Sequence, residues 1–192
     1  MPSDSLTIAL IGATPTAEQI ASRALRAGLI VIIDDISDAR LQATSRHLHA
    51  VVGAQDSCAP GPQVQSASGR SGLSSSFSAS PNLHLTQSID SAIRQSDFLI
   101  DALPDDLEVK LELFTLFDKF AKPNAILITT GSIPIDDLAA ITFCPDRCLA
   151  IRPTSSQNKV LSFQVIPGSQ TSPQTLATCT NLFHHALSFR AT

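Results

Sequence analysis

The sequence predicts an α/β fold: a doubly wound, mostly parallel sheet. Two observations predict this class. Apolar runs of strand length alternate with segments of helical periodicity, as in chains built from successive β and α units. The runs are apolar at nearly every position, as in Leu6–Ile11, which is typical of strands buried on both faces. With 192 residues and 43% hydrophobic content, we expect residues 1–192 to form a single domain.

The expected elements follow each other in regular alternation. Apolar runs predict strands at Leu6–Ile11, Leu29–Ile33, Phe98–Ala102, Ala125–Thr129, Cys148–Ile151 and Leu161–Ile166. Helical periodicity predicts helices at Thr16–Ala27, Asp38–His49, Ile89–Arg94, Asp106–Phe120, Ile135–Ile141 and Pro173–Leu187. Because most of these strands are followed by a helix, they are expected to pair in parallel through helical crossovers.

Residues 52–82 interrupt this alternation. The segment is rich in Ser, Gly, Pro and Gln, and its only charged residues are Asp56 and Arg70. Such a composition buries too little apolar surface to offset the entropy of ordering the chain. We therefore expect a flexible, disordered low-complexity insertion rather than a binding motif.

Composition excludes several classes of function. The net charge is −4, from 13 basic and 17 acidic residues, and there is no basic run, so neither nucleic acid nor an anionic membrane is an expected partner. The N-terminus is polar and no apolar stretch approaches the roughly 20 residues of a membrane span. The expected location is the cytoplasm.

Metal and covalent hydrolase chemistry also lack support. The four cysteines, Cys58, Cys144, Cys148 and Cys179, contain no C-x-x-C pair, and the histidines do not complete a ligand set. Reduced, mostly buried thiols are expected, with no bound metal. Neither a G-x-S-x-G elbow nor an H-E-x-x-H helix occurs.

The first turn after the first strand carries part of a nucleotide-binding pattern. A Rossmann site has the pattern G-x-G-x-x-G at this place. Its first glycine makes the tight turn, its second lets the backbone approach the pyrophosphate, and its third allows the helix to pack closely on the strand. This chain reads Gly12-Ala13-Thr14-Pro15-Thr16-Ala17. Gly12 keeps the first role and Ala17 suits the third. Thr14 places a side chain where phosphate oxygens would lie, although its hydroxyl could contact an anion, and Pro15 has no N–H to donate.

Asp35 supplies a second part of the pattern. It lies 23 residues after Gly12, near the spacing of the carboxylate that binds the adenosine ribose of NAD. No neighbouring Arg is expected, so NAD would be preferred over NADP. The alternative is that Asp34 and Asp35 only end a strand and cap the next helix. NAD is therefore a possible cofactor of a Rossmann-like domain.

Several longer segments resemble one family. Asp97–Phe114 reads DFLIDALPDDLEVKLELF and is similar to the "AD-LVIEAVPEDLELK-ELF" segment of the 3-hydroxyacyl-CoA dehydrogenases. The similarity continues through Pro123–Ile135, Cys144–Arg147, Val165–Gly168 and Thr171–Pro173. The resemblance covers nearly the whole chain except the Ser-rich segment, and it implies the NAD-binding domain of that family.

The resemblance implies a catalytic His in a "GLHFFNPP" segment and a Glu partner on the next strand. Arg152 stands at the His position, and Gln164 stands twelve residues later at the Glu position. An arginine with a pKa above ~12 cannot act as a general base, and an amide does not titrate. The family's Ser corresponds to Gly131 or to Ser132. Ordinary 3-hydroxyacyl-CoA dehydrogenation is therefore not expected.

Two further differences point the same way. The family's helical hairpin, which helps hold the coenzyme A tail, corresponds to the Ser-rich segment, which contains no Lys. The family's helical C-terminal domain would begin at about Thr192. Recognition of an acyl-CoA by this chain is not expected.

By resemblance, Asp105 and Lys110 line the nicotinamide side of the cofactor. The alternative is an exposed helix start, where carboxylates suit the helix dipole.

Arg152 follows a strand at the sheet edge where ligands of open α/β folds bind, so it could hold a carboxylate or polarise a carbonyl. Its alternative is a surface ion pair with Asp146 or Asp105.

These observations give three hypotheses of function. The first is a small-molecule enzyme of non-redox type, a cyclase or isomerase, with Arg152, Gln164, Ser132 and Thr154 as the catalytic residues. Gly12, Thr14, Asp35, Asp105 and Lys110 are the cofactor-binding candidates. The second is an NAD-dependent oxidoreductase with an altered site. The third is a non-catalytic interaction module, which pairs with a full-length relative or forms a homodimer.

Overall fold

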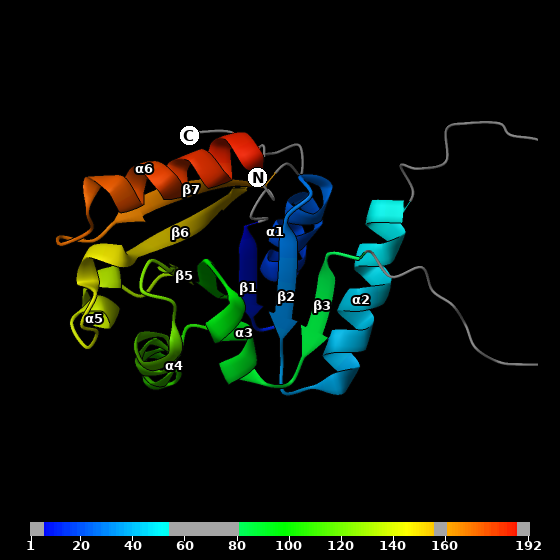
Figure 1. Ribbon diagram of the computed structural model, residues 1–192, viewed down its shortest axis with the longest axis horizontal. Coiled ribbons are helices and arrows are strands. Elements are labelled where there is room, and N and C mark those ends of the chain that lie inside the picture. Colours follow the sequence, from blue (N-terminus) through cyan, green and yellow to red (C-terminus); the bar gives the residue numbers. More distant parts are fainter. Residues whose placement is uncertain (1–5, 54–80, 156–160, 188–192) are drawn as a thin grey trace, which may run out of the picture.

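The computed structural model describes residues 6–53, 81–155 and 161–187, and it confirms the predicted fold class. The sheet has seven strands in the order β3-β2-β1-β4-β5-β6-β7, all parallel except the antiparallel pair β6 and β7 (Figure 1). The strands are β1 (Thr7–Ile11), β2 (Ile30–Asp34), β3 (Leu83–Thr86), β4 (Phe98–Asp101), β5 (Ile126–Thr130), β6 (Cys148–Ser155) and β7 (Leu161–Pro167).

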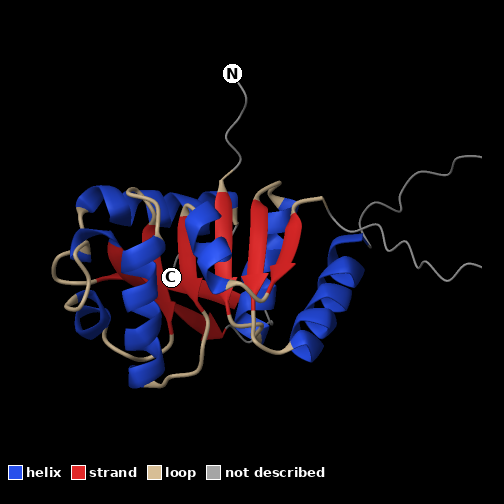
Figure 2. Cartoon of the chain, turned by 60° about the horizontal axis from the view of Figure 1, so that its bottom comes forward, coloured by secondary structure: helices blue, strands red, loops and turns tan. Residues whose placement is uncertain are grey.

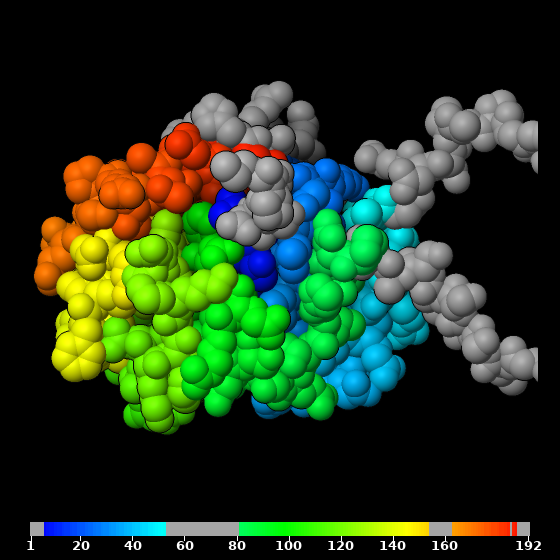
Figure 3. Space-filling view, viewed as in Figure 1, coloured from blue at the N-terminus to red at the C-terminus, as the bar shows by residue number. Residues whose placement is uncertain are grey.

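Helices cover both faces of the sheet (Figure 2). They are α1 (Pro15–Arg26), α2 (Asp38–Gly53), α3 (Ile89–Gln95), α4 (Leu107–Phe120), α5 (Ile135–Ala139) and α6 (Pro173–Asn181). Ile8 and Leu10 of β1 pack in the core beneath α1, α2 and α6, whereas the alternate residues Ala9 and Ile11 pack beneath α3, α4 and α5. The two cores explain why the strands are apolar at every position. In the space-filling view, the green residues of α3 and α4 lie over the middle and lower part of one face (Figure 3).

The structure adds one strand and shifts several predicted boundaries. Strand β3 was not predicted, because it is a short edge strand in which His84 and Leu85 are exposed. Strand β6 extends to Ser155. The last helix ends its α-helical part at Asn181 and continues as a π-helical turn, Leu182–Ala186. Of the predicted insertion 52–82, residues 54–80 lie outside the described residues, and residues 52 and 53 belong to α2.

The strand order creates one crevice. From β1 the chain winds outward through β2 to β3, and it then returns to β4 on the other side of β1. Ligands of open parallel sheets bind at such a reversal, outside the carboxyl ends of the strands. The segments that follow β1, β4 and β5, and the part of β6 beyond Ile151, meet at this edge.

Candidate functional site

Gly12 forms the tight turn after β1. Its φ is +104°, and a Cβ there would lie 3.1 Å from Leu103 Cδ2 and 3.2 Å from the Ala102 carbonyl oxygen. An L side chain would therefore be strained by the backbone conformation and crowded by its neighbours. The backbone of β1 approaches the end of β4 closely at this residue, which confirms the turn predicted from the glycine.

Thr14 and Pro15 shape the start of α1. The Thr14 side chain accepts a hydrogen bond of 3.3 Å from the Ala17 N–H and caps the helix, and Pro15 is the first helical residue. The Thr16 N–H has no acceptor in the part of the chain that the structure describes. A helix N-terminus attracts anions, so Thr16 is the donor that remains for a phosphate. The sequence pattern indicated the missing N–H of Pro15 and the Thr14 hydroxyl but not the Thr16 N–H.

Asp35 lies just beyond β2, and its carboxylate is fully engaged. Oδ2 accepts from the Ala13 N–H at 2.9 Å, and Oδ1 accepts from the Ser37 N–H at 2.7 Å. Oδ1 also accepts from Nε and Nη2 of Arg40, at 3.1 and 2.7 Å. Burial favours a higher pKa for Asp35, but these hydrogen bonds and the charge of Arg40 lower it.

The expectation that Asp35 has no neighbouring Arg is therefore wrong. Arg40 stands only five residues further along, but the first turn of α2 folds its guanidinium back onto the carboxylate. The short sequence distance was a signal that could have revealed it.

An open cleft of about 250 Å³ lies at the carboxyl edge of the sheet. It is lined by Thr14, Thr16, Ala102, Leu103, Pro104, Asp105, Thr130, Gly131 and Pro153. The glycine turn, the end of β4 and the end of β5 thus form one surface. The expected cofactor candidates Gly12, Thr14 and Asp105 lie on or directly beside it.

Lys110 is buried beneath this cleft. Its side chain has 0% exposure, and Nζ lies 2.6 Å from Oδ2 of Asp101, which is also fully buried. Nζ also donates to the carbonyl oxygens of Leu103 and Thr130, each at 3.1 Å. The alternative of an exposed helix start is wrong for Lys110. Its ammonium is closed off from the cleft, and it holds two of the cleft walls in place instead.

Asp105 and Arg152 fix the turn after β5. Asp105 Oδ2 accepts from the N–H and hydroxyl of Ser132, at 3.0 and 2.8 Å. Gly131 has a φ of +110°, and a Cβ there would collide with the Asp105 carboxylate. Burial favours a higher pKa for Asp105, but the Ser132 hydrogen bonds and the charges of Lys110 and Arg152 lower it.

The Arg152 guanidinium reaches over the same turn. It donates to the carbonyl oxygens of Gly131 and Ser132, at 3.3 and 3.2 Å. It forms no salt bridge with Asp146 or Asp105 among the described residues, so the surface ion pair is not formed. Arg152 remains exposed beside Pro153 of the cleft wall.

Gln164 stands directly opposite Arg152 in the antiparallel register of β6 and β7. The two positions that would hold the family dyad are thus paired as the sequence similarity implies, and both side chains are exposed. Thr154 lies in β6 opposite Ser162, and its side chain lies outside the described residues. The structure brings Ser132, Arg152 and Gln164 to one edge of the sheet.

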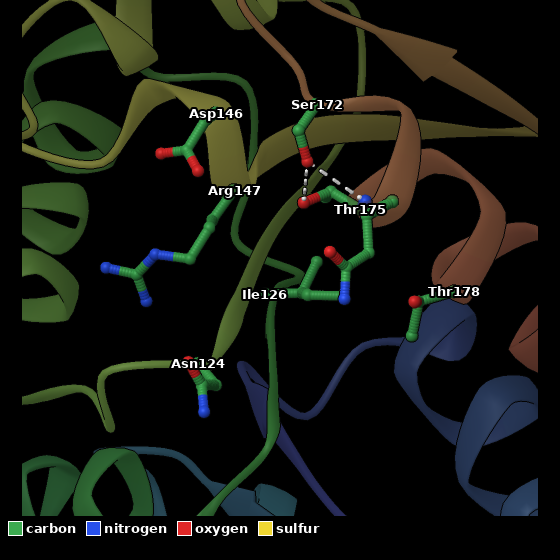
Figure 4. A pocket seen from close by; sticks show the side chains of 8 residues that line it. Asn124, Ile126, Asp146, Arg147, Ser172, Thr175 and Thr178 are labelled. Carbon is green, nitrogen blue, oxygen red and sulfur yellow. Dashed lines mark hydrogen bonds between the residues drawn. The ribbon is translucent and has the colours of Figure 1, made fainter.

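A larger pocket of about 410 Å³ lies elsewhere, near the amino end of β5 (Figure 4). Its lining consists of Asn124, Ile126, Asp146, Arg147, Ser172, Gln174, Thr175 and Thr178. Several of its polar groups bond within the protein: Arg147 donates to the Lys122 and Ala125 carbonyl oxygens, and Ser172 caps α6. Its position at the opposite end of the strands separates it from the edge where open parallel sheets bind nucleotides.

Within residues 6–53, 81–155 and 161–187, no group of three or more His, Cys, Asp or Glu side chains could hold a metal ion. None of the helices in these ranges has the length and apolar character to cross a membrane. Cys144, Cys148 and Cys179 are free and buried.

One family model matches nearly the whole chain, including the glycine turn and Asp35. The model of the 3-hydroxyacyl-CoA dehydrogenase NAD-binding domain covers residues 7–186. The chain belongs to this family. Among its relatives is the 5-formyl-3-hydroxy-2-methylpyridine 4-carboxylate 5-dehydrogenase of Mesorhizobium japonicum, 24% identical over 91% of this chain and 53% of the relative. The L-carnitine dehydrogenase of Burkholderia mallei is 29% identical over 88% of this chain and 49% of the relative.

Solved structures of 3-hydroxyacyl-CoA dehydrogenase type share the fold. The (S)-3-hydroxybutyryl-CoA dehydrogenase of Ralstonia eutropha has a TM-score of 0.77 at 23% identity and matches 98% of this chain and 62% of its own. The 3-hydroxybutyryl-CoA dehydrogenase of Escherichia coli K12 has a TM-score of 0.78 at 21% identity, over 98% of this chain and 38% of its own. The chain spans about half the length of the curated relatives named above.

These relatives change the weight of the hypotheses. They are dehydrogenases, so the oxidoreductase alternative is supported better than the cyclase or isomerase, which has no support among them. The interaction module and the homodimer stay predictions.

Proposed function

We propose that this chain binds a nicotinamide dinucleotide in the cleft and serves as the NAD-binding domain of a dehydrogenase-type oxidoreductase with an altered substrate site. The observation that carries the proposal is the Gly12 turn, whose φ of +104° disfavours any residue with a side chain and where a Cβ would crowd Leu103. A turn of this kind at the strand-order reversal lets a dinucleotide approach the backbone.

The chain's own residues fit the cofactor in part. The Thr16 N–H at the start of α1 can take a phosphate oxygen, and the apolar surface of Leu103 and Pro104 can contact a planar ring at the end of β4. Thr14 narrows the same cleft. We therefore expect binding that is weaker than in a family member with the full glycine pattern.

Arg152 determines which half-reaction suits the site. The bound cofactor would supply or accept a hydride at the substrate carbon. Oxidation of an alcohol also needs a base for the hydroxyl proton, and a guanidinium does not serve as one. In the reduction of a carbonyl, Arg152 would stabilise the negative charge that develops on oxygen, and water would then donate the proton. Arg152 also suits a substrate carboxylate, and one relative is named for a carboxylate substrate.

Direct titration with NADH tests the binding proposal. We expect saturable binding, followed by cofactor fluorescence together with the melting temperature. Thr14→Gly restores the second glycine of the pattern and should tighten binding, because the side chain in the cleft is removed and a glycine cap costs only a few tenths of a kcal/mol. Gly12→Val should abolish binding. No saturable binding by either the wild type or Thr14→Gly would overturn the proposal and favour the interaction module.

Activity of Arg152→Ala tests the role of this residue. With NADH and a simple 3-oxo acid such as acetoacetate, oxidation of NADH should fall by roughly 100-fold, while the Kd for NADH stays unchanged. Arg147→Ala, at the opposite end of the strands, is the control. An unchanged rate in Arg152→Ala would show that Arg152 does not contact the reacting substrate.

A further inference from the structure

We infer that the adenosine ribose position, just beyond β2 and beside the glycine turn, accepts NADPH at least as well as NADH, because the exposed group there is the guanidinium of Arg40 rather than the carboxylate of Asp35. The inference rests on the proposed function and specifies the cofactor of the same site. It reverses the preference for NAD that the sequence alone suggested.

Asp35 is poorly placed to bind a ribose. Its side chain is only 4% exposed, and Oδ1 already accepts three hydrogen bonds, one from Ser37 and two from Arg40. Oδ2 anchors the glycine turn through the Ala13 N–H. A carboxylate selects NAD by accepting hydrogen bonds from the ribose hydroxyls. Here those hydroxyls would have to displace contacts that hold the turn and the start of α2.

Arg40 has the opposite properties. Its side chain is 58% exposed, and it uses only Nε and Nη2 toward Asp35. A guanidinium carries five N–H donors, so its outer edge keeps donors that have no acceptor within the described residues. Planar guanidinium groups bind phosphate through paired hydrogen bonds. An Arg at this place is the feature that accommodates the 2′-phosphate of NADP.

The local charges permit a phosphate. Arg40 offsets the charge of Asp35, so the like-charge repulsion that a lone carboxylate would exert is reduced. The opposing charges are Asp34, which is buried, and Asp38 in the first turn of α2. The carboxylate of Asp38 accepts from Gln42 Nε2 at 2.6 Å, one turn further along the helix, and is thereby engaged by a donor of its own.

Parallel titrations with NADH and NADPH test the inference. The wild type should bind NADPH with a Kd equal to or lower than that for NADH. Arg40→Ala should weaken NADPH by roughly 10- to 100-fold, the effect of losing charge-assisted hydrogen bonds. Binding of NADH should be unchanged or tighter in the same variant, because Asp35 Oδ1 becomes available. Arg46→Ala, an exposed Arg on the same helix, should change neither affinity.

The outcomes separate the two proposals. Binding of NADH with NADPH at least ten-fold weaker would overturn this inference and leave the proposed function intact. Binding of neither dinucleotide would overturn the proposed function. Should Arg40→Ala melt below the assay temperature, Arg40→Lys gives the same comparison: it keeps the charge, loses the planar fork, and should weaken NADPH but not NADH. Equal weakening of both dinucleotides in Arg40→Lys would also contradict the role of Arg40.

Discussion

Lys110→Met is expected to lower the free energy of unfolding by about 3–5 kcal/mol, the cost of leaving one member of a buried ion pair without its partner. The side chains of Lys110 and Asp101 are both fully buried, with Nζ and Oδ2 at 2.6 Å. For a domain of this size the melting temperature should fall by roughly 10 °C. Urea unfolding of the wild type and the variant measures the loss.

The pH dependence of the variant follows from Asp101. Burial raises the pKa of this carboxyl, and the charge and hydrogen bonds of Lys110, with those of Thr129 and Leu103, oppose the rise. Without the ammonium, the folded-state pKa of Asp101 lies further above its unfolded value. Between these two pKa values, the variant therefore takes up a proton at Asp101 when it folds. Its stability is then retained at acid pH and lost as the pH rises through the folded-state pKa. The deficit should therefore be larger at pH 8 than at pH 5.

Two controls identify the cause of the loss. The double variant Asp101→Asn, Lys110→Met removes both charges and should recover part of the lost stability, because neutral replacement of a buried pair is often tolerated. Lys119→Met, on the exposed side of α4, should change stability by less than about 0.5 kcal/mol. A loss below about 1 kcal/mol in Lys110→Met would contradict a structural role for the pair.

The fold was predictable because its strands are apolar at every position. The core strands β1, β2, β4 and β5 are buried along their whole length or nearly so, and such runs are read directly from sequence. Strand β3 was missed because only Leu83 and Leu85 carry its apolar signal, and Leu85 is itself exposed. Edge strands bury little surface and leave a weak pattern.

Site residues could be predicted only where their backbone conformation or their spacing along the sequence identifies them. Gly12 was identified because the turn requires a glycine, and Asp35 because its spacing is fixed by the strand, helix and strand between them. The burial of Lys110 was not predicted, because its carbonyl partner on Thr130 comes from strand β5, 20 residues away in the sequence. Contacts between elements depend on the packing of the whole domain, which local pattern does not contain.

Asp34→Asn is expected to stabilise the protein at neutral and alkaline pH, in contrast to most substitutions of buried residues. Asp34 ends β2 and is 5% exposed, and its Oδ1 has no hydrogen-bond partner among the residues that the structure describes. Burial, and then the charge of Asp35 beside it, raise the pKa of Asp34 from 3.8 to about 6. Ionising this carboxyl in the folded protein is therefore unfavourable.

The sign of the pH effect follows from that shift. Between pH 3.8 and about 6 the folded state binds a proton at Asp34 that the unfolded state has released. Stability from this group is present below the unfolded pKa and is lost as the pH rises to 6. The full loss is at most roughly 3 kcal/mol, since one pKa unit corresponds to about 1.4 kcal/mol. Asp34→Asn should remove this dependence.

Urea unfolding of the wild type and of Asp34→Asn across the pH range tests this prediction, with Asp35→Asn as the matched variant. Asp34→Asn should be about 1–3 kcal/mol more stable than the wild type at pH 8 and equal to it at pH 4. Asp35→Asn should show the opposite sign. The pKa of Asp35 is lowered by Ala13, Ser37 and Arg40, so its contribution is present at neutral pH and is lost as the solution is acidified. If Asp34→Asn were destabilising at pH 8, the ionised carboxylate would have a partner that outweighs its burial. Opposite signs at adjacent residues would instead show that the chain tolerates an unfavourable carboxylate directly beside the one that anchors its glycine turn.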